Sequence, residues 1–328
     1  MSQDLIQRAR AALARSAKTL LTTHQSPDGD GLGSEMALAS YLRTIGKSPL
    51  ILNPDETPER YRFLDPSGEI KVFDASTGPG LLRSCDLIVT LDNSSLHRLG
   101  PMEQAVREAR VATLCIDHHS TTDPFWAINL IDETACATGE MIYDLIRELG
   151  GALDGRSAVA LYTAILTDTG GFRFSKTSPR THRITAALLA AGVDPSSVYE
   201  QVYEQQPEGF IRLMGVALAG FRLEAEGRLG WIALTRRQMI ECNAEQVDTS
   251  EIVNHLFAIR GVKVCLLFKE LADGKVKISL RSKGSIDIHR VAVSHGGGGH
   301  QNASGAVVEG PLESAIPRII ADARALLS

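Results

Sequence analysis

The 328-residue chain contains no apolar run that approaches the ~18 residues a membrane-spanning helix needs. Its first segment, residues 1–21, has neither the apolar core nor the small-residue cleavage site of a signal peptide. We expect this segment to form a surface helix, and we expect no membrane partner.

Cysteine is also sparse, and the five cysteines are widely spaced and never form a C-x-x-C pair. Nothing in this pattern indicates a disulfide framework or a zinc knuckle. Cys115 and Cys265 lie inside apolar runs, which favours a packing role. Free, buried thiols fit a reducing cytoplasm, which is the expected location.

An excess of basic residues is missing as well, since the formal net charge is -5 at pH 7. Proteins that coat long nucleic acids usually have a broad basic surface. No long nucleic-acid partner is therefore expected. A small anionic substrate needs only a local basic patch and is compatible with this charge.

The sequence does contain alternating strand-like and helix-like segments over residues 1–192. Apolar strands separated by helices predict a parallel sheet covered on both faces. The strand candidates are residues 19–24, 48–52, 86–92 and 111–117, and the helix candidates are residues 31–46, 101–110, 137–150, 157–170 and 178–192.

The pattern changes at residues 193–210, a polar segment with two prolines that we expect to be a linker. Three β-rich segments follow, and the Asp273–Gly274 step between the last two predicts a hairpin. We therefore expect an α/β fold with two domains, a parallel-sheet domain over residues 1–192 and a smaller α/β domain over residues 211–328. The β-rich segments are residues 228–235, 262–271 and 275–284.

Three of the predicted strands end in acids and imidazoles. The carboxyl ends of parallel strands form one rim, and ligands bind in the crevice there. Asp168, at the end of a helical run, could approach the same edge. The strand-end residues are His24 with Asp28 and Asp30, Asp92, and the run Asp117, His118 and His119.

Each of these residues alone has a plainer explanation. An aspartate after a strand is commonly a helix N-cap, and adjacent histidines occur on surfaces without a function. Four carboxylates and three imidazoles at one rim, however, would repel or stay unpaired without a cation. Ligands of this type without thiolate suit Mn²⁺ or Mg²⁺, and the histidines favour Mn²⁺. The donors suffice for two ions ~3.5–4 Å apart, the clamp used in phosphoryl chemistry.

Five ordered motifs resemble those of a known family. "SPDGDGLGS", "LDNSS", "IDHHS" and "LTDTGGF" resemble the four motifs of the DHH phosphoesterases, and "GGGGHQNASGA" resembles the signature of their DHH-associated C-terminal domain. The resemblance implies a catalytic domain and a substrate-binding domain with a cleft between them. Size and domain pairing look most like the bacterial branch that degrades very short oligoribonucleotides (nanoRNase) and dephosphorylates 3′-phosphoadenosine 5′-phosphate (PAP).

The resemblance also implies roles for individual residues. Asp92 would bridge two Mn²⁺ ions, with Mg²⁺ or Co²⁺ as possible substitutes. Asp117 would orient a neighbouring imidazole, and His119 would donate to a non-bridging phosphate oxygen. The implied ligand sets are His24, Asp28 and Asp92 for one ion, and Asp30, Asp92, His118 and Asp168 for the other.

In the second domain the basic residues favour an anionic ligand. Between His255 and Arg290 there are eight Lys or Arg against three Asp or Glu. Arg281 shares one face of its predicted strand with Lys275 and Lys277, which a solvated hairpin face would also explain. The substrate-binding candidates are Arg281 and Ser282 for a terminal phosphate, the glycine run Gly297, Gly298 and Gly299 with His300 as a phosphate cradle, and Arg98 as a weaker candidate.

Three further residues have two interpretations. Arg180 fits a surface or helix-start charge better than a substrate contact. Phe172 and Phe174 fit core packing better than stacking on a base.

The sequence thus predicts a metal-dependent phosphoesterase acting on oligonucleotides of two to about five nucleotides, on PAP, or on both. A phosphodiesterase for linear (pApA, pGpG) or cyclic dinucleotides is the alternative within the same chemistry. A nucleotide-binding regulator without turnover is the alternative of another class, and the intact ligand set disfavours it. The chain could act as a homodimer.

Overall fold

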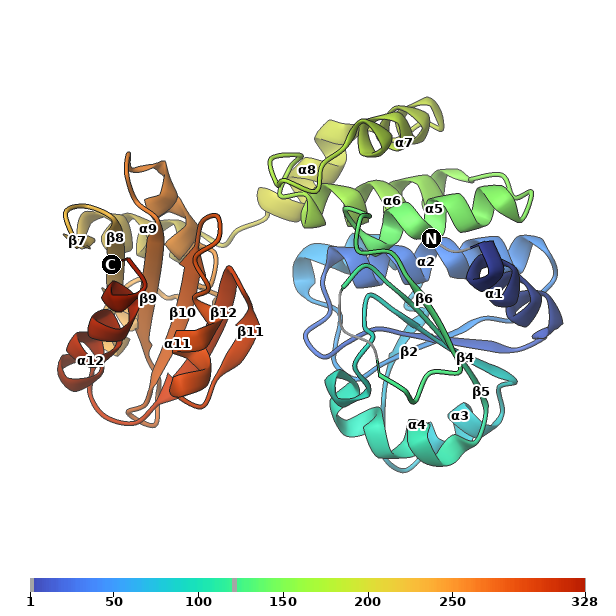
Figure 1. The fold of residues 1–328 in the computed structure, drawn as a ribbon, viewed down its shortest axis with the longest axis horizontal. Coiled ribbons are helices and arrows are strands. Elements are labelled where there is room, and N and C mark those ends of the chain that lie inside the picture. The colour runs from blue at the N-terminus through green and yellow to red at the C-terminus, as the bar shows by residue number, and fades with distance from the viewer. Residues whose placement is uncertain (1–2, 120–122, 328) are drawn as a thin grey trace. The chain divides into compact units, whose positions relative to one another are not determined.

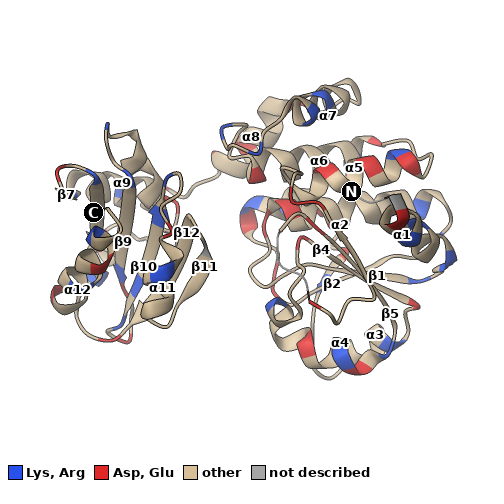
Figure 2. Cartoon of the chain, in the orientation of Figure 1, with Lys and Arg blue, Asp and Glu red and all other residues tan. Residues whose placement is uncertain are grey.

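A computed structural model describes residues 3–119 and 123–327, which divide into two units between Gln205 and Gln206 (Figure 1). Each unit is built around its own six-stranded sheet. No helix in these described ranges is long and apolar enough to cross a bilayer. Figure 2 shows Lys and Arg interspersed with Asp and Glu on helices of both units, in keeping with the balanced composition.

The sheet of the first unit is parallel throughout, as predicted, in the order β3-β2-β1-β4-β5-β6. β1 and β4 are neighbours although two strands separate them in sequence. The strand order reverses at this pair, and the carboxyl ends of such a pair open into a crevice. The strands are β1 (Thr19–Thr22), β2 (Leu50–Asn53), β3 (Ile70–Val72), β4 (Leu87–Leu91), β5 (Ala112–Asp117) and β6 (Ile128–Ile131).

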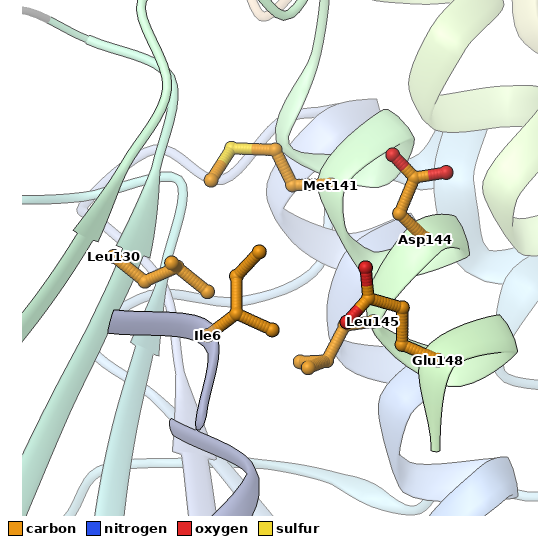
Figure 3. A pocket seen from close by; sticks show the side chains of 6 residues that line it. All are labelled: Ile6, Leu130, Met141, Asp144, Leu145 and Glu148. Carbon is orange, nitrogen blue, oxygen red and sulfur yellow. The ribbon is translucent and has the colours of Figure 1, made fainter. Parts of the chain in front are cut away.

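Helices cover both faces of this sheet, and each face has its own apolar cluster (Figure 1). The N-terminal helix packs Ile6 beside Leu130, Met141 and Leu145, as Figure 3 shows. One face carries α1 (Gln3–Arg15), α2 (Gly29–Thr44), α5 (Thr138–Glu148) and α6 (Gly155–Asp168), with α7 (Pro179–Ala190), α8 (Pro195–Tyr203) and η1 (Glu59–Leu64) beside them; the other carries α3 (Gly78–Arg83), η2 (Leu96–Met102) and α4 (Glu103–Ala109).

The segment predicted as a linker, residues 193–210, is largely helical. Pro195 is the first residue of α8, where its missing amide hydrogen leaves no bond unmade. Val198 and Val202 of α8 are buried in the core of the first unit. Pro207 precedes α9 (Glu208–Ala219), which belongs to the second unit. The prolines therefore start helices, and only residues 204–207 lie between α8 and α9.

The second unit has a mixed sheet in the order β11-β12-β10-β9-β8-β7, in which only the β8–β9 pair is parallel. The predicted hairpin is present, with Gly274 at φ +80° between β9 and β10. Its strands are β7 (Arg222–Glu224), β8 (Leu229–Leu234), β9 (Val264–Glu270), β10 (Val276–Ser282), β11 (Gly298–His300) and β12 (Ala303–Val308); α11 (His289–Ser294) and α12 (Leu312–Ala325) pack on one face, and α9, α10 (Arg236–Glu241) and η3 (Ile252–Ala258) on the other.

The glycine run is partly a strand and not only a loop, because β11 pairs with β12. A Cβ on Gly297 would lie 2.1 Å from the Gly305 carbonyl oxygen, and Gly299 has φ +134°. Only glycine permits this close approach and this backbone conformation. The run therefore forms a flat edge of the sheet made of backbone alone.

Candidate metal centre

Asp92 lies at the middle of the acid and imidazole cluster, directly after β4. Its side chain is buried, and its φ of 56° is a conformation that a non-glycine residue adopts only where the surroundings hold it. Its Oδ2 lies 3.5 Å from His24 Nε2, and its Oδ1 lies 3.5 Å from His118 Nε2. The two oxygens of one carboxylate thus face two different imidazoles.

The first group around Asp92 consists of His24 and Asp28, and the potential ligand atoms of the three residues lie within 4.8 Å of one another. The Nδ1 atom of His24 is 2.6 Å from the Gln25 carbonyl oxygen, which turns Nε2 toward the acids. Asp28 caps α2 by accepting hydrogen bonds on Oδ1, whereas its Oδ2 lies 3.8 Å from His24 Nε2. Asp28 is therefore both a helix cap and a possible ligand.

The second group consists of Asp30, His118 and Asp168, again within 4.8 Å of one another. His118 Nε2 lies 3.7 Å from Asp30 Oδ2 and 3.4 Å from Asp168 Oδ2. Its Nδ1 faces the Ala135 carbonyl oxygen at 3.3 Å. Carboxylates from α2 and α6 thereby meet an imidazole that follows β5.

The N-terminus of α5 holds two of these carboxylates. Asp30 accepts the backbone N–H of Thr138 on Oδ2 at 2.6 Å and that of Gly139 on Oδ1 at 2.8 Å. The Thr138 hydroxyl donates to Asp92 Oδ1 at 3.2 Å. Thr138 is not among the residues predicted from the sequence, and the only signal for it is its place at the start of a predicted helix.

His119 and Asp117 form a pair at the edge of the cluster. Asp117 Oδ1 is 2.7 Å from His119 Nδ1 and accepts the His119 backbone N–H at 3.1 Å. His119 Nδ1 also lies 3.6 Å from Asp92 Oδ1. Asp117 thus contacts the neighbouring imidazole that it was predicted to orient.

Burial and crowding shift the pKa values of the second group strongly. Burial, together with the negative charges of Asp92 and Asp168, raises the pKa of Asp30 well above its usual value. Burial likewise raises the pKa of Asp168 to about 7. Burial alone would lower the pKa of His118, but its interactions with the surrounding carboxylates outweigh this and raise it to about 10.

Asp92 shows the opposite shift. Its burial favours the neutral acid, but the imidazoles of His118 and His24, each 3.5 Å from one of its oxygens, outweigh this and lower the pKa of Asp92 well below the usual range. Burial alone would lower the pKa of His24, but its interactions with Asp92 and Asp28 raise it. Asp92, which faces an imidazole of each group, is therefore a carboxylate that stays charged.

The donors fit a cation better than they fit one another. Within the described residues, His118 Nε2 is buried and has no hydrogen-bond partner, although three carboxylates lie 3.4–3.7 Å away. An imidazole whose Nδ1 faces a backbone carbonyl and whose Nε2 faces carboxylates is arranged as metal-ligating histidines usually are. These residues fit one or more divalent cations.

The remaining candidates lie elsewhere in each unit. The backbone carbonyl oxygen of Arg98, in η2, accepts the Gln25 N–H. The positive charge of its side chain opposes the rise in the pKa of His24. Arg281 is half-buried on β10, opposite Ala303 of β12. The Ser282 hydroxyl is buried and donates to the Ile286 carbonyl oxygen, so it serves a local turn. The side chain of His300 lies outside what the structure describes.

Arg180 has a structural contact that explains it. Its guanidinium lies 2.7 Å from Glu140 Oε1 and also pairs with Asp144. Glu140 is almost completely buried on α5. Arg180 therefore neutralises a buried acid instead of standing alone on the surface.

Both units of the chain match domains of known proteins. Residues 18–167 match the model of the DHH family, N-terminal domain, and residues 236–328 match the DHHA1 domain. The chain belongs to the DHH family. Over 304 residues this DHH chain is 31% identical to the bifunctional oligoribonuclease and PAP phosphatase NrnA of Thermus thermophilus, covering 92% of this chain and 87% of that protein.

Two other relatives cover nearly the whole DHH chain. NrnA of Bacillus subtilis is 27% identical over 94% of both proteins. The crystal structure of an exopolyphosphatase-related protein from Bacteroides fragilis superposes with a TM-score of 0.94 at 28% identity, covering 99% of this chain and 96% of that one. The similarity therefore extends across both units.

Proposed function

We propose that the chain is a metal-dependent phosphoesterase that hydrolyses oligoribonucleotides of two to about five nucleotides to mononucleotides and removes the 3′-phosphate of PAP. The observation that carries this proposal is that two ligand groups meet at Asp92, which belongs to the first group and lies 3.5 Å from His118 of the second. The names of the Thermus and Bacillus relatives support the substrate class.

The proposed cofactor is a pair of Mn²⁺ ions, because the donors are carboxylates and imidazoles without thiolate. Mg²⁺ and Co²⁺ are the alternatives that the same donors accept. Bound divalent cations would supply positive charge that lowers the pKa of water and neutralises phosphate oxygens. The proposed ligands are His24, Asp28 and Asp92 for one ion, and Asp30, Asp92, His118 and Asp168 for the other.

The protein's own residues would orient the reaction. Thr138 and the α5 N-terminus hold Asp92 and Asp30 in place through the hydrogen bonds described above. Asp117 fixes the His119 ring, which we assign to donate a hydrogen bond to a non-bridging phosphate oxygen as negative charge develops there. Arg98, beside His24, adds positive charge to the same edge.

We assign the terminal phosphate of the substrate to Arg281 and to the glycine run Gly297–Gly299 with His300. Arg281 shares the face of β10 with Lys277 and Ser279, and this face lies opposite the one that Val276 and Ile278 bury. The small residues Ala303 and Gly305 of β12 lie beside it in register. A guanidinium next to exposed backbone is a suitable site for a phosphate.

An Arg281→Ala variant tests this assignment. We expect KM for a dinucleotide to rise at least tenfold with kcat little changed, because Arg281 would bind the substrate away from the reacting bond. Lys277→Ala, on the same face of the same strand, is the matched control and should leave KM near the wild-type value. A fall in kcat with unchanged KM would contradict the assignment.

The proposed function is tested by assaying the purified chain with Mn²⁺ on PAP, pApA, a five-nucleotide RNA and a twenty-nucleotide RNA. We expect free phosphate from PAP and mononucleotides from the short oligomers. Activity confined to the twenty-nucleotide RNA, or undiminished activity after exhaustive chelation, would refute the proposal.

A further inference from the structure

The segment that follows Asp168 turns back on the end of α6. Three consecutive residues, Gly170, Gly171 and Phe172, have φ between +56° and +71° and turn the chain sharply after α6. The backbone N–H groups of Arg173 and Phe174 both donate to the Thr169 carbonyl oxygen. The segment is therefore tied back to the end of the helix that carries Asp168.

The two aromatic residues of this segment have different surroundings. Phe172 packs against the core of the first unit, and its ring stacks on His182 at 5.4 Å between centroids. Phe174 is 49% exposed, whereas phenylalanine side chains are mostly buried in folded proteins. Core packing therefore explains Phe172 but leaves Phe174 unexplained.

Phe174 lies directly over Gly170. A Cβ on Gly170 would be 2.6 Å from the Cζ atom of the Phe174 ring, so only glycine allows the ring to lie there. Gly170 is two residues from Asp168, a proposed metal ligand. The ring is thus held over the turn that follows a proposed metal ligand, and it is still open to solvent.

Two cationic side chains belong to the same segment as the ring. The Arg173 guanidinium lies over it, 5.2 Å from its centroid. The Lys176 ammonium donates to the His118 carbonyl oxygen at 3.3 Å. An exposed aromatic ring with a cationic side chain beside it is a surface on which proteins stack the bases of single-stranded nucleic acids.

We propose that Phe174 stacks on the base of the nucleotide whose phosphate is bound at the metal centre, and that Lys176 contacts that phosphate. The inference rests on the proposed function and adds a base-binding subsite to it. Because every base has an aromatic face, such a subsite selects nucleotides over sugar phosphates without selecting one sequence.

The test compares AMP with ribose 5-phosphate, which lacks only the base, by calorimetric titration of the Mn²⁺-loaded protein. The wild-type chain should bind AMP more tightly. Phe174→Ala should weaken AMP binding about tenfold and leave ribose 5-phosphate binding unchanged. Equal weakening of both ligands, or of neither, would overturn the stacking assignment.

Phe174→Trp is the conservative variant and provides a second readout. It should keep the wild-type affinity for AMP, and AMP but not ribose 5-phosphate should quench the fluorescence of the added indole. Lys176→Met should weaken both ligands by a similar factor, since it removes a phosphate contact. A loss restricted to AMP would contradict that role for Lys176.

Tyr199→Ala is the matched control, because Tyr199 is 47% exposed on α8 and its ring contacts Tyr203. Its affinity for both ligands should equal that of the wild type.

The binding readout separates the two proposals. If the wild type does not hydrolyse short oligonucleotides, and Phe174→Ala no longer prefers AMP to ribose 5-phosphate, the proposed reaction fails and the subsite stands. If it hydrolyses them and Phe174→Ala binds AMP normally, only the subsite fails.

Discussion

Asp92 lies between the two ligand groups and contacts both of them. The end of β4 places it at the point where the strand order reverses, and each of its oxygens faces a different imidazole. Those imidazoles hold the pKa of Asp92 well below its usual range, so the carboxylate stays charged in spite of its burial. A side chain in this position is the one on which both ligand groups depend.

We therefore expect Asp92→Ala to lose both bound ions and all turnover, whereas a variant of a ligand to one ion should keep part of the metal. Elemental analysis of protein dialysed against Mn²⁺ measures the metal content directly. Glu108→Ala, an exposed acid on α4, serves as the control. Wild-type metal content in Asp92→Ala would contradict the bridging assignment.

Glu35 is a buried acid outside the proposed ligand set. It lies on α2 without solvent exposure, and its Oε2 accepts a hydrogen bond from Asn53 Nδ2 at 2.9 Å. Burial raises its pKa from 4.5 to about 8, and the bond from Asn53 opposes this only in part. Between these pKa values the folded chain therefore binds a proton that the unfolded chain releases.

Stability should accordingly fall as the pH rises from about 5 to about 8, by up to about 1.4 kcal/mol per pH unit for this one group. Glu35→Gln cannot titrate, so its free energy of unfolding should depend less steeply on pH in that interval. Urea denaturation with a chelator present measures both slopes, and Glu108→Gln is the control. Equal slopes for Glu35→Gln and the wild type would show that Glu35 is charged in the folded chain.

The proposed ligands could be found from the sequence because they follow strands. Asp92 and His118 come directly after β4 and β5, and His24 follows β1 after one residue. Parallel strands bring their carboxyl ends to one edge. Asn53 ends β2 at the same edge and obeys the same rule, but an amide beside two prolines and acids gave no distinctive pattern. Thr138 could not be found this way, since its contact with Asp92 depends on how α5 packs.

At the scale of elements, the contact between α2 and α6 brings Asp30 and Asp168 toward each other. Gly33 of α2 faces the backbone of α6, where a Cβ would lie 2.3 Å from the Ala160 carbonyl oxygen. Since this neighbour is backbone, it cannot move aside alone. The spacing of the two helices therefore depends on a glycine in the middle of α2.

We expect Gly33→Ala to destabilise the chain by about 1–3 kcal/mol, although alanine is the better helix former. Gly80→Ala in α3 is the control, because nothing lies within 4 Å of the added Cβ there. Its stability should be unchanged or about 1 kcal/mol higher. Urea denaturation of the two variants gives the comparison, and a Gly33→Ala variant as stable as Gly80→Ala would contradict the close approach.

Elements with a local signal were predicted and those that depend on partners were not. The Asp273–Gly274 turn identifies the β9–β10 hairpin by itself, and alternating apolar strands and helices identify the parallel sheet. β11 begins with two glycines, so it has no alternation of side chains to predict it, and it forms by pairing with β12. The α8 helix was missed because its two buried valines are spaced among polar residues and prolines.

At the scale of the whole molecule, the chain has two units with separate apolar clusters. Two clusters lie on the faces of the first sheet and two on the faces of the second. All of the proposed metal ligands belong to the first unit, and Arg281 and the glycine run belong to the second. Metal binding and terminal-phosphate binding are thus assigned to units with independent cores.

This division predicts that metal stabilises only one of the units. A ligand that binds the folded state alone at 100 times its dissociation constant adds about 2.7 kcal/mol to stability, and 1 kcal/mol raises Tm by about 2–4 °C in a domain of this size. Scanning calorimetry should therefore resolve two transitions, of which saturating Mn²⁺ raises one by roughly 5–10 °C and leaves the other in place. In Asp92→Ala neither transition should respond, because that carboxylate faces an imidazole of each ligand group and is proposed to bind both ions. A Mn²⁺-dependent shift of both transitions in the wild type, or of either one in Asp92→Ala, would show that the cations bind somewhere other than the cluster around Asp92.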